Sequence, residues 1–271
     1  MTGKSYQELL PDDMPDVTSL NIFFVILGLL AIAFIICLPR YIKASIKNAA
    51  AHGTSPLFPL FMCSYRTLKF VYPIFFVFFA FGGSLLGIGI YMSVATYQIS
   101  ISLFSIHRFF NDRRPVEMRK NLTSKNVILT LAITFSIIFV KELGTLYFTI
   151  MFFLNEPTKI NFLVIYCFAT YIPYQILLFV GMALQFCMEP STSHSENIVA
   201  ANTKILGATK IVMFLITGLC CATGFLVTAA LLLFFSIDVF LIPLVIEITE
   251  IRATPNVIQQ SNDASVPREI V

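Results

Sequence analysis

Five long apolar stretches, separated by short polar or basic segments, dominate this chain. They cover residues 22–38, 70–106, 127–154, 160–188 and 205–246. A helix that crosses a lipid bilayer needs about 20 mostly apolar residues. The pattern therefore predicts an all-α membrane protein built as a bundle of transmembrane helices.

Two of these stretches are too long for a single crossing. Residues 70–106 contain no charged side chain, and one helix of that length would measure roughly 55 Å, against ~30 Å for the hydrocarbon core. Residues 205–246, whose only charges are Lys210 and Asp238, pose the same problem. We therefore expect each stretch to form two helices. Glycines mark the expected turns, which are Gly82-Gly83, Gly87 or Gly89 in the first stretch and the interval from Gly218 to Gly224 in the second.

Basic residues are concentrated in two connecting segments, 39–70 and 107–126. Lysine and arginine favour the cytoplasmic side of a membrane, so both segments are expected in the cytoplasm. An even number of crossings must then separate them, which agrees with two helices in residues 70–106. The chain as a whole is predicted to cross the membrane seven times, with its N-terminus outside and its C-terminus in the cytoplasm.

The seven-helix transmembrane domain is expected to span residues 22–248. Residues 1–21 are acidic and form an extracellular segment without a recognisable cleavable signal. Residues 249–271 are polar and poor in apolar clusters, which predicts a disordered cytoplasmic tail.

The composition excludes most other classes of protein. Hydrophobic residues make up 57% of the chain and charged residues only 12%, too few to cover a water-facing surface or to bind nucleic acid. Catalytic motifs such as HExxH, GxSxG and a phosphate-binding loop are missing, and the three histidines are scattered over loops and helix ends. No cysteine has metal-ligand spacing beside a histidine. We therefore expect no catalytic residue, no cofactor and no metal site.

Four charged residues lie inside the apolar stretches, and such residues are functional candidates by default. Lys141 and Glu142 are neighbours, so they are expected to point about 100° apart and not to share a partner. With Asp238 they are candidates for a ligand-binding cavity, although Lys141 could instead extend to outer water. Lys210 and Asp238 are expected at similar depth on consecutive helices, which predicts an interhelical ion pair. The alternative for Asp238 is a polar network between helices.

Five short stretches resemble the nematode serpentine receptors of class Z. They are Phe58-Pro59 with Tyr65–Lys69, then Ser102–Phe109, Phe139–Leu143, Tyr171–Pro173 and Ser236–Ile248. The resemblance runs from about residue 56 to residue 250, and the last stretch is the most specific. It implies a G-protein-coupled chemosensory receptor in the plasma membrane, including the ciliary membrane of sensory neurons. Its implied partners are an extracellular small-molecule ligand, a heterotrimeric G protein and the lipid bilayer.

Arg108 lies where the predicted third helix meets the cytoplasm. Its placement resembles the arginine of rhodopsin-like receptors, but the acid and the tyrosine beside that arginine are missing here. Arg108 is therefore a candidate for G-protein coupling or for a lock on the inactive state. The alternative is a basic anchor at the inner leaflet. A small transporter or channel subunit, and a structural membrane scaffold, remain rival functions. The few intramembrane charges and the lack of an internal repeat argue against a transporter.

The predicted topology makes Asn121 a direct test. Asn121-Leu122-Thr123 is a glycosylation sequon inside the basic segment 107–126. We expect it to stay unmodified, since the glycosylating enzyme works in the lumen. An epitope tag inserted beside Asn121 should be reached by antibody only after cells are permeabilised. Glycan attached to Asn121 in the native chain would overturn this orientation.

Overall fold

The computed structural model describes residues 17–74, 84–118, 122–155, 160–191, 193–224 and 226–265. The elements in these ranges are helices and short turns, and none of the described residues lies in a strand. In chain order they are α1 (Val17–Gly53), α2 (Phe58–Arg66), the π-helix η2 (Thr67–Val71), α4 (Ser84–Asp112), the short 3₁₀ helix η3 (Val116–Met118), α5 (Ser124–Asn155), α6 (Ile160–Phe186), α7 (His194–Thr223), α8 (Val227–Ser236) and α9 (Asp238–Ser265). The prediction of an all-α protein is confirmed.

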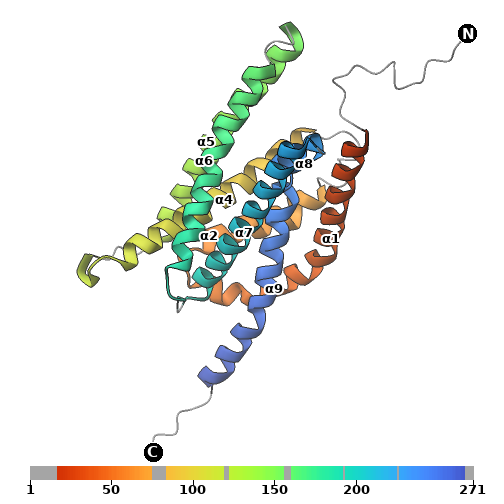
Figure 1. Cartoon of the computed structure of the whole chain (residues 1–271). Helices are drawn as coiled ribbons and strands as arrows, with labels where there is room; N and C mark the ends of the chain where they lie inside the picture. The colour runs from red at the N-terminus through yellow and green to blue at the C-terminus, as the bar shows by residue number, and fades with distance from the viewer. Residues whose placement is uncertain are drawn as a thin grey trace, which may run out of the picture.

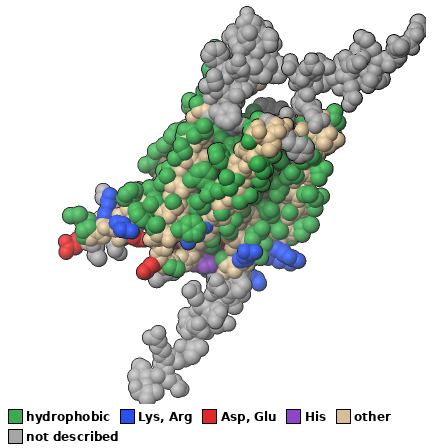
Figure 2. All heavy atoms as spheres, in the orientation of Figure 1, with side chains coloured by type: hydrophobic (Ala, Val, Ile, Leu, Met, Phe, Trp, Pro, Cys, Tyr) green, Lys and Arg blue, Asp and Glu red, His purple; other side chains and the backbone are tan. Residues whose placement is uncertain are grey.

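Five of the described helical segments are long and apolar enough to cross a membrane. They are Val17–Gly53, Ile88–Asp112, Ser124–Ile150, Ala169–Phe186 and His194–Thr223. Large apolar side chains cover the middle of the molecule, whereas the visible Lys, Arg, Asp and Glu side chains gather toward its lower end (Figure 2). A surface of this kind matches lipid on its sides and water at its ends. The chain is therefore a helical membrane protein.

The helices pack around α4 and α9. Helix α4 contacts α5, α6, α7 and α9, and α9 contacts α1, α7 and α4. Figure 1 shows α9 running down beside α1 and α7. Helix α6 approaches α4 closely at Gly181, where an added Cβ would lie only 3.2 Å from Ser102 Cα. A small residue at such a crossing lets two membrane helices pack backbone to backbone.

The apolar stretch at residues 205–246 turns once, at Gly224. Helix α7 ends at Thr223, and both Gly224 (φ 69°) and Leu226 (φ 52°) adopt the left-handed conformation. Gly218, which was expected to bracket this turn, stays inside α7. In the earlier stretch Gly87 and Gly89 belong to α4, which begins at Ser84. The expected turn at Gly82-Gly83 lies outside the described residues.

The helices extend beyond both ends of residues 22–248. Helix α1 begins at Val17, five residues before residue 22. Helix α9 continues to Ser265, so the chain is not disordered from residue 249 onward. Thr249 and Glu250 are buried because their polar groups pair with other helices. The predicted disorder of residues 266–271 lies outside the described residues.

Candidate functional site

Lys210 and Asp238 form a buried ion pair between α7 and the first residue of α9. Lys210 Nζ lies 2.5 Å from Asp238 Oδ1, and the two residues are 1% and 3% exposed. The structure thus brings together the two side chains whose pairing the sequence predicted. Since either charge alone would be costly in a low-dielectric interior, each holds the other's helix in place.

Tyr171 adds a third helix to this pair. Its hydroxyl accepts a hydrogen bond from Lys210 Nζ (2.9 Å) and lies 3.2 Å from Asp238 Oδ2, to which it donates. Tyr171 belongs to α6 and stands directly before Ile172 and Pro173. We call Lys210, Asp238 and Tyr171 the charged triad. It ties α6, α7 and α9 together at one point.

A very small cavity adjoins the charged triad. It measures about 10 Å³ and is lined by Asp238, Tyr171, Tyr91, Gln98 and Gln175 among others. The amide groups of Gln98 and Gln175 carry nitrogen atoms that find no hydrogen-bond partner among the described residues. A cavity of this size holds about one water molecule. Water bridging the two amides to Asp238 would satisfy these groups.

Lys141 and Glu142 pair with each other, a contact that the expected divergence of their Cβ directions did not suggest. Lys141 Nζ lies 2.5 Å from Glu142 Oε1, and both side chains are mostly buried. Their Cβ atoms do point apart on the helix, but the long side chains bend back together. Lys141 Nζ also lies 3.5 Å from the hydroxyl of Tyr91, a residue that lines the small cavity. The three predicted ligand-site candidates therefore surround one region, with Tyr91 between the Lys141–Glu142 pair and Asp238.

A second buried polar cluster ties α1, α7 and α9 together near the other end of α7. His52 Nε2 lies 2.7 Å from Glu250 Oε1, and His52 Nδ1 lies 3.0 Å from Ser195 Oγ. Asn48 Nδ2 donates to the same Glu250 oxygen at 3.0 Å. All four residues are almost completely buried. Two of the three histidines come together here, since the His52 and His194 rings lie 5.6 Å apart, and both stand at helix ends as expected.

Asn202 extends this polar cluster to α4. Its side chain donates to the Tyr97 hydroxyl (2.6 Å) and accepts from the Thr249 hydroxyl (2.6 Å). Sequence analysis missed these contacts because it assigned residues 249–271 to a tail. One signal was present. Asp238, Thr249 and Glu250 follow or interrupt an apolar helical stretch, and polar side chains buried there need hydrogen-bond partners on other helices. Within the described ranges, no group of three metal-ligating side chains comes together.

Arg108 lines a cavity that measures about 330 Å³. Its guanidinium reaches Glu196 on α7 (Nε to Oε2, 3.5 Å) and Asp112 on its own helix (3.6 Å). Arg108 Nη2 also donates to the backbone carbonyl of Glu189, in the connection before α7 (2.8 Å). Arg108 therefore bridges α4 to the beginning of α7.

Comparisons with protein families, with curated proteins and with solved structures found no match. The resemblance to class Z serpentine receptors therefore remains a hypothesis, and function has to be argued from the geometry of these sites.

The Lys210–Asp238 pair predicts a strongly non-additive double-mutant cycle. Asp238→Ala should lower stability by about 3 kcal/mol, because it leaves a buried ammonium without its counter-ion. Combining Lys210→Ala with Asp238→Ala should cost less than Asp238→Ala alone, since no orphan charge remains. Melting temperature in detergent micelles and the amount of protein at the cell surface measure both effects.

Lys204→Ala provides the matched control for this cycle. Lys204 is also on α7, but its ammonium lies over the Phe186 ring instead of beside a carboxylate. We expect its loss to change the melting temperature little. Additive effects of the Lys210 and Asp238 substitutions would mean that the two residues do not stabilise one another.

Proposed function

We propose that this chain is a seven-helix receptor that couples binding of a small extracellular molecule to a heterotrimeric G protein, as in the class Z serpentine receptors. The order of the helices supports this proposal. Helix α2 runs into η2 without a gap, and only Ile237 separates α8 from α9. We take each of these pairs as one further crossing beside the five described segments that are long and apolar enough to span a membrane, which gives the proposed seven. In the topology that the basic segments predict, the cavity beside Arg108 opens to the cytoplasm, and the receptor resides in the plasma membrane or in its ciliary extension.

The observation that carries the proposal is the bridge from Arg108 to Glu196, which both line the 330 Å³ cavity. A receptor needs an intracellular surface with two arrangements, one closed and one able to hold a partner. The ion pair is partly exposed, so it contributes modestly and can be exchanged for contacts with a partner. Breaking it frees the beginning of α7 from α4 and leaves Arg108 available to a G protein.

Helix α7 provides the connection between the outer and inner sites. It carries Lys210 of the charged triad, Asn202 of the polar cluster and Glu196 of the Arg108 bridge. From Lys210 to Glu196 the helix rises about 21 Å. A ligand that shifts the charged triad therefore displaces a rigid rod whose other end holds Arg108. The proposed coupling thus requires that α7 has two positions, one with the Arg108–Glu196 contact formed and one with it broken.

The Arg108 bridge can be tested without knowing the ligand. Glu196→Gln removes one ion pair worth about 0.5–1 kcal/mol, so ligand-free signalling should rise about two- to fivefold. Adding Arg108→Ala to Glu196→Gln should abolish this rise, because the arginine is then missing from the coupling surface. Energy transfer between Gα and Gβγ subunits in cells, normalised to receptor at the surface, measures the signal.

Glu189→Gln is the matched control, since Glu189 contributes its backbone carbonyl to Arg108 and the substitution leaves that carbonyl in place. Ion flux should be recorded in the same cells. If Glu196→Gln raises ion flux and activates no G protein, the chain is a channel or transporter subunit instead. If neither signal changes, Arg108 and Glu196 form a structural contact only.

A further inference from the structure

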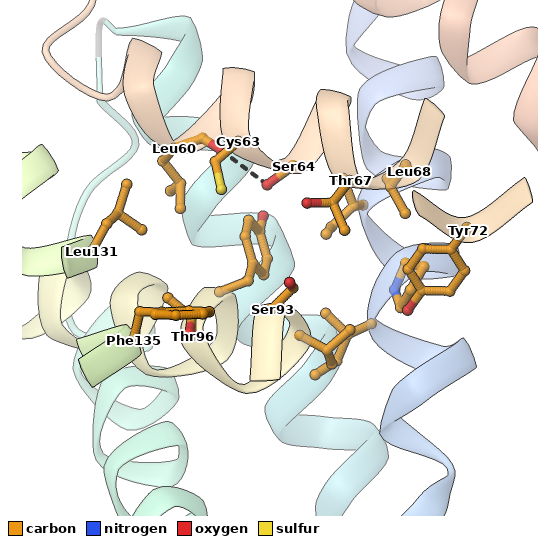
Figure 3. A pocket seen from close by; sticks show the side chains of 15 residues that line it. Leu60, Cys63, Ser64, Thr67, Leu68, Tyr72, Ser93, Thr96, Leu131 and Phe135 are labelled. Atoms are coloured by element: carbon orange, nitrogen blue, oxygen red, sulfur yellow. Dashed lines mark hydrogen bonds between the residues drawn. The ribbon is translucent and has the colours of Figure 1, made fainter. Parts of the chain in front are cut away.

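A cavity of about 110 Å³ lies between α2, η2, α4, α5 and α9, and its lining includes neither Arg108 nor a residue of the charged triad. Figure 3 shows it from close by, with Cys63 and Thr67 on one wall, Ser93 and Thr96 on the opposite wall, and Leu131 with Phe135 at one side. Cys63 on α2 is exposed, and Phe135 on α5 is 44% exposed. The cavity therefore opens between α2 and α5, on the apolar side of the protein.

Hydroxyl groups interrupt the apolar walls, and three of them already donate their protons to backbone carbonyls of their own helices. Ser93 Oγ donates to the Gly89 carbonyl (3.0 Å), and Thr96 Oγ1 donates to the Met92 carbonyl (2.7 Å). Ser64 Oγ likewise donates to the Leu60 carbonyl. Each oxygen keeps lone pairs that can accept a hydrogen bond. The cavity thus offers acceptors to an incoming O–H group inside an otherwise apolar space.

The backbone at this wall departs from regular α-helix. Thr67 and Leu68 line the cavity and both belong to the π-helix η2. Single π-helical turns within α-helices are rare and occur frequently at functional sites, because they carry a cost in stability. This is a second observation, independent of the cavity's volume, that marks the same place.

We propose that this cavity binds a small apolar molecule with one hydroxyl group, of the size and chemistry of a phenol or a short-chain alcohol. An apolar cavity of ~150 Å³ is known to hold benzene, so 110 Å³ suits a molecule no larger than benzene, or a slightly larger one that extends partly through the opening. A lipid acyl chain is too long for this volume and has no proton to donate to Ser93 or Thr96. The molecule enters from the membrane, where it concentrates by partitioning.

The occupied cavity is positioned to act on α9. Ile242, Pro243 and Ile246 of α9 form one wall, between the charged triad at the start of the helix and the Glu250 contacts near its middle. Tyr97 lines the cavity and accepts the hydrogen bond from Asn202 on α7. The role of this cavity as the ligand site of a receptor rests on the function proposed above. The binding of a small molecule in the cavity does not depend on that function.

Cys63 is a built-in reporter for occupancy. The experiment uses the full chain in lipid nanodiscs, phenol as the probe, and mass spectrometry to follow alkylation of each cysteine by N-ethylmaleimide. At ten times its dissociation constant, phenol should slow the alkylation of Cys63 about tenfold, because only the empty cavity reacts. Alkylation of Cys187, which is exposed and does not line the cavity, should not change.

Ser93→Phe fills the cavity and should remove this protection. Ser136→Phe is the matched control, because Ser136 also bonds its own helix four residues back but faces outward from α5. Phenol should protect Cys63 in Ser136→Phe as in the native chain. A circular dichroism melt establishes that both variants are folded. Equal protection in Ser93→Phe and in the native chain, or no protection in the native chain, overturns the proposal.

The assay also separates this site from the proposed function, since alkylation of Cys63 requires no G protein. Protection of Cys63 without any G-protein signal supports the binding site and counts against the receptor. A G-protein signal that Glu196→Gln raises, without protection of Cys63, supports the receptor and rejects this cavity as a ligand site.

Discussion

The pairing of Lys210 with Asp238 is the contact on which the arrangement of the last helices depends. In a lipid bilayer the hydrophobic effect does not bring helices together, because lipid tails are as apolar as the side chains they contact. Packing and polar contacts must decide which helices become neighbours. Each charge alone would cost about 2.5–3.5 kcal/mol on insertion scales, so a position that leaves them apart is disfavoured. Tyr171 strengthens this choice by fixing α6 to the same point.

Helix α9 is held in the same way near its middle. Glu250 pairs with His52 on α1, and Thr249 pairs with Asn202 on α7. The two sets of contacts are about 18 Å apart along the helix. Between them α9 presents Ile242, Pro243 and Ile246 to the apolar cavity. A molecule bound in that cavity would therefore press on the segment of α9 that lies between these two sets of polar contacts. This arrangement explains how binding in the membrane could reach Arg108 through α7.

The sequence predicted those features that depend on runs of residues or on strong local costs. Uninterrupted apolar stretches predicted helices, and two unpaired charges at similar depth predicted the contact of Lys210 with Asp238. The bent side chains of Lys141 and Glu142 could not be predicted, because helical spacing describes Cβ directions and not the reach of long side chains. Glu250 and His52 are 198 residues apart, and nothing local to either one identifies the other. The apolar cavity could not be predicted either. It depends on how four helices rotate about their axes and on a π-helical turn that the sequence of residues 67–71 does not indicate.

Solid-state NMR of the full chain in lipid bilayers tests the central contact most directly. With ¹⁵N and ¹³C labels, dipolar recoupling detects a Lys Nζ and an Asp carboxyl carbon only when they lie within about 4 Å, the range of an ion pair. The Lys141–Glu142 pair gives a separate lysine-to-glutamate signal and serves as an internal reference. We predict a lysine-to-aspartate signal in the native chain that disappears in Lys210→Met while the reference signal remains. A native spectrum that contains the reference signal but no lysine-to-aspartate signal would contradict the pairing of α7 with α9.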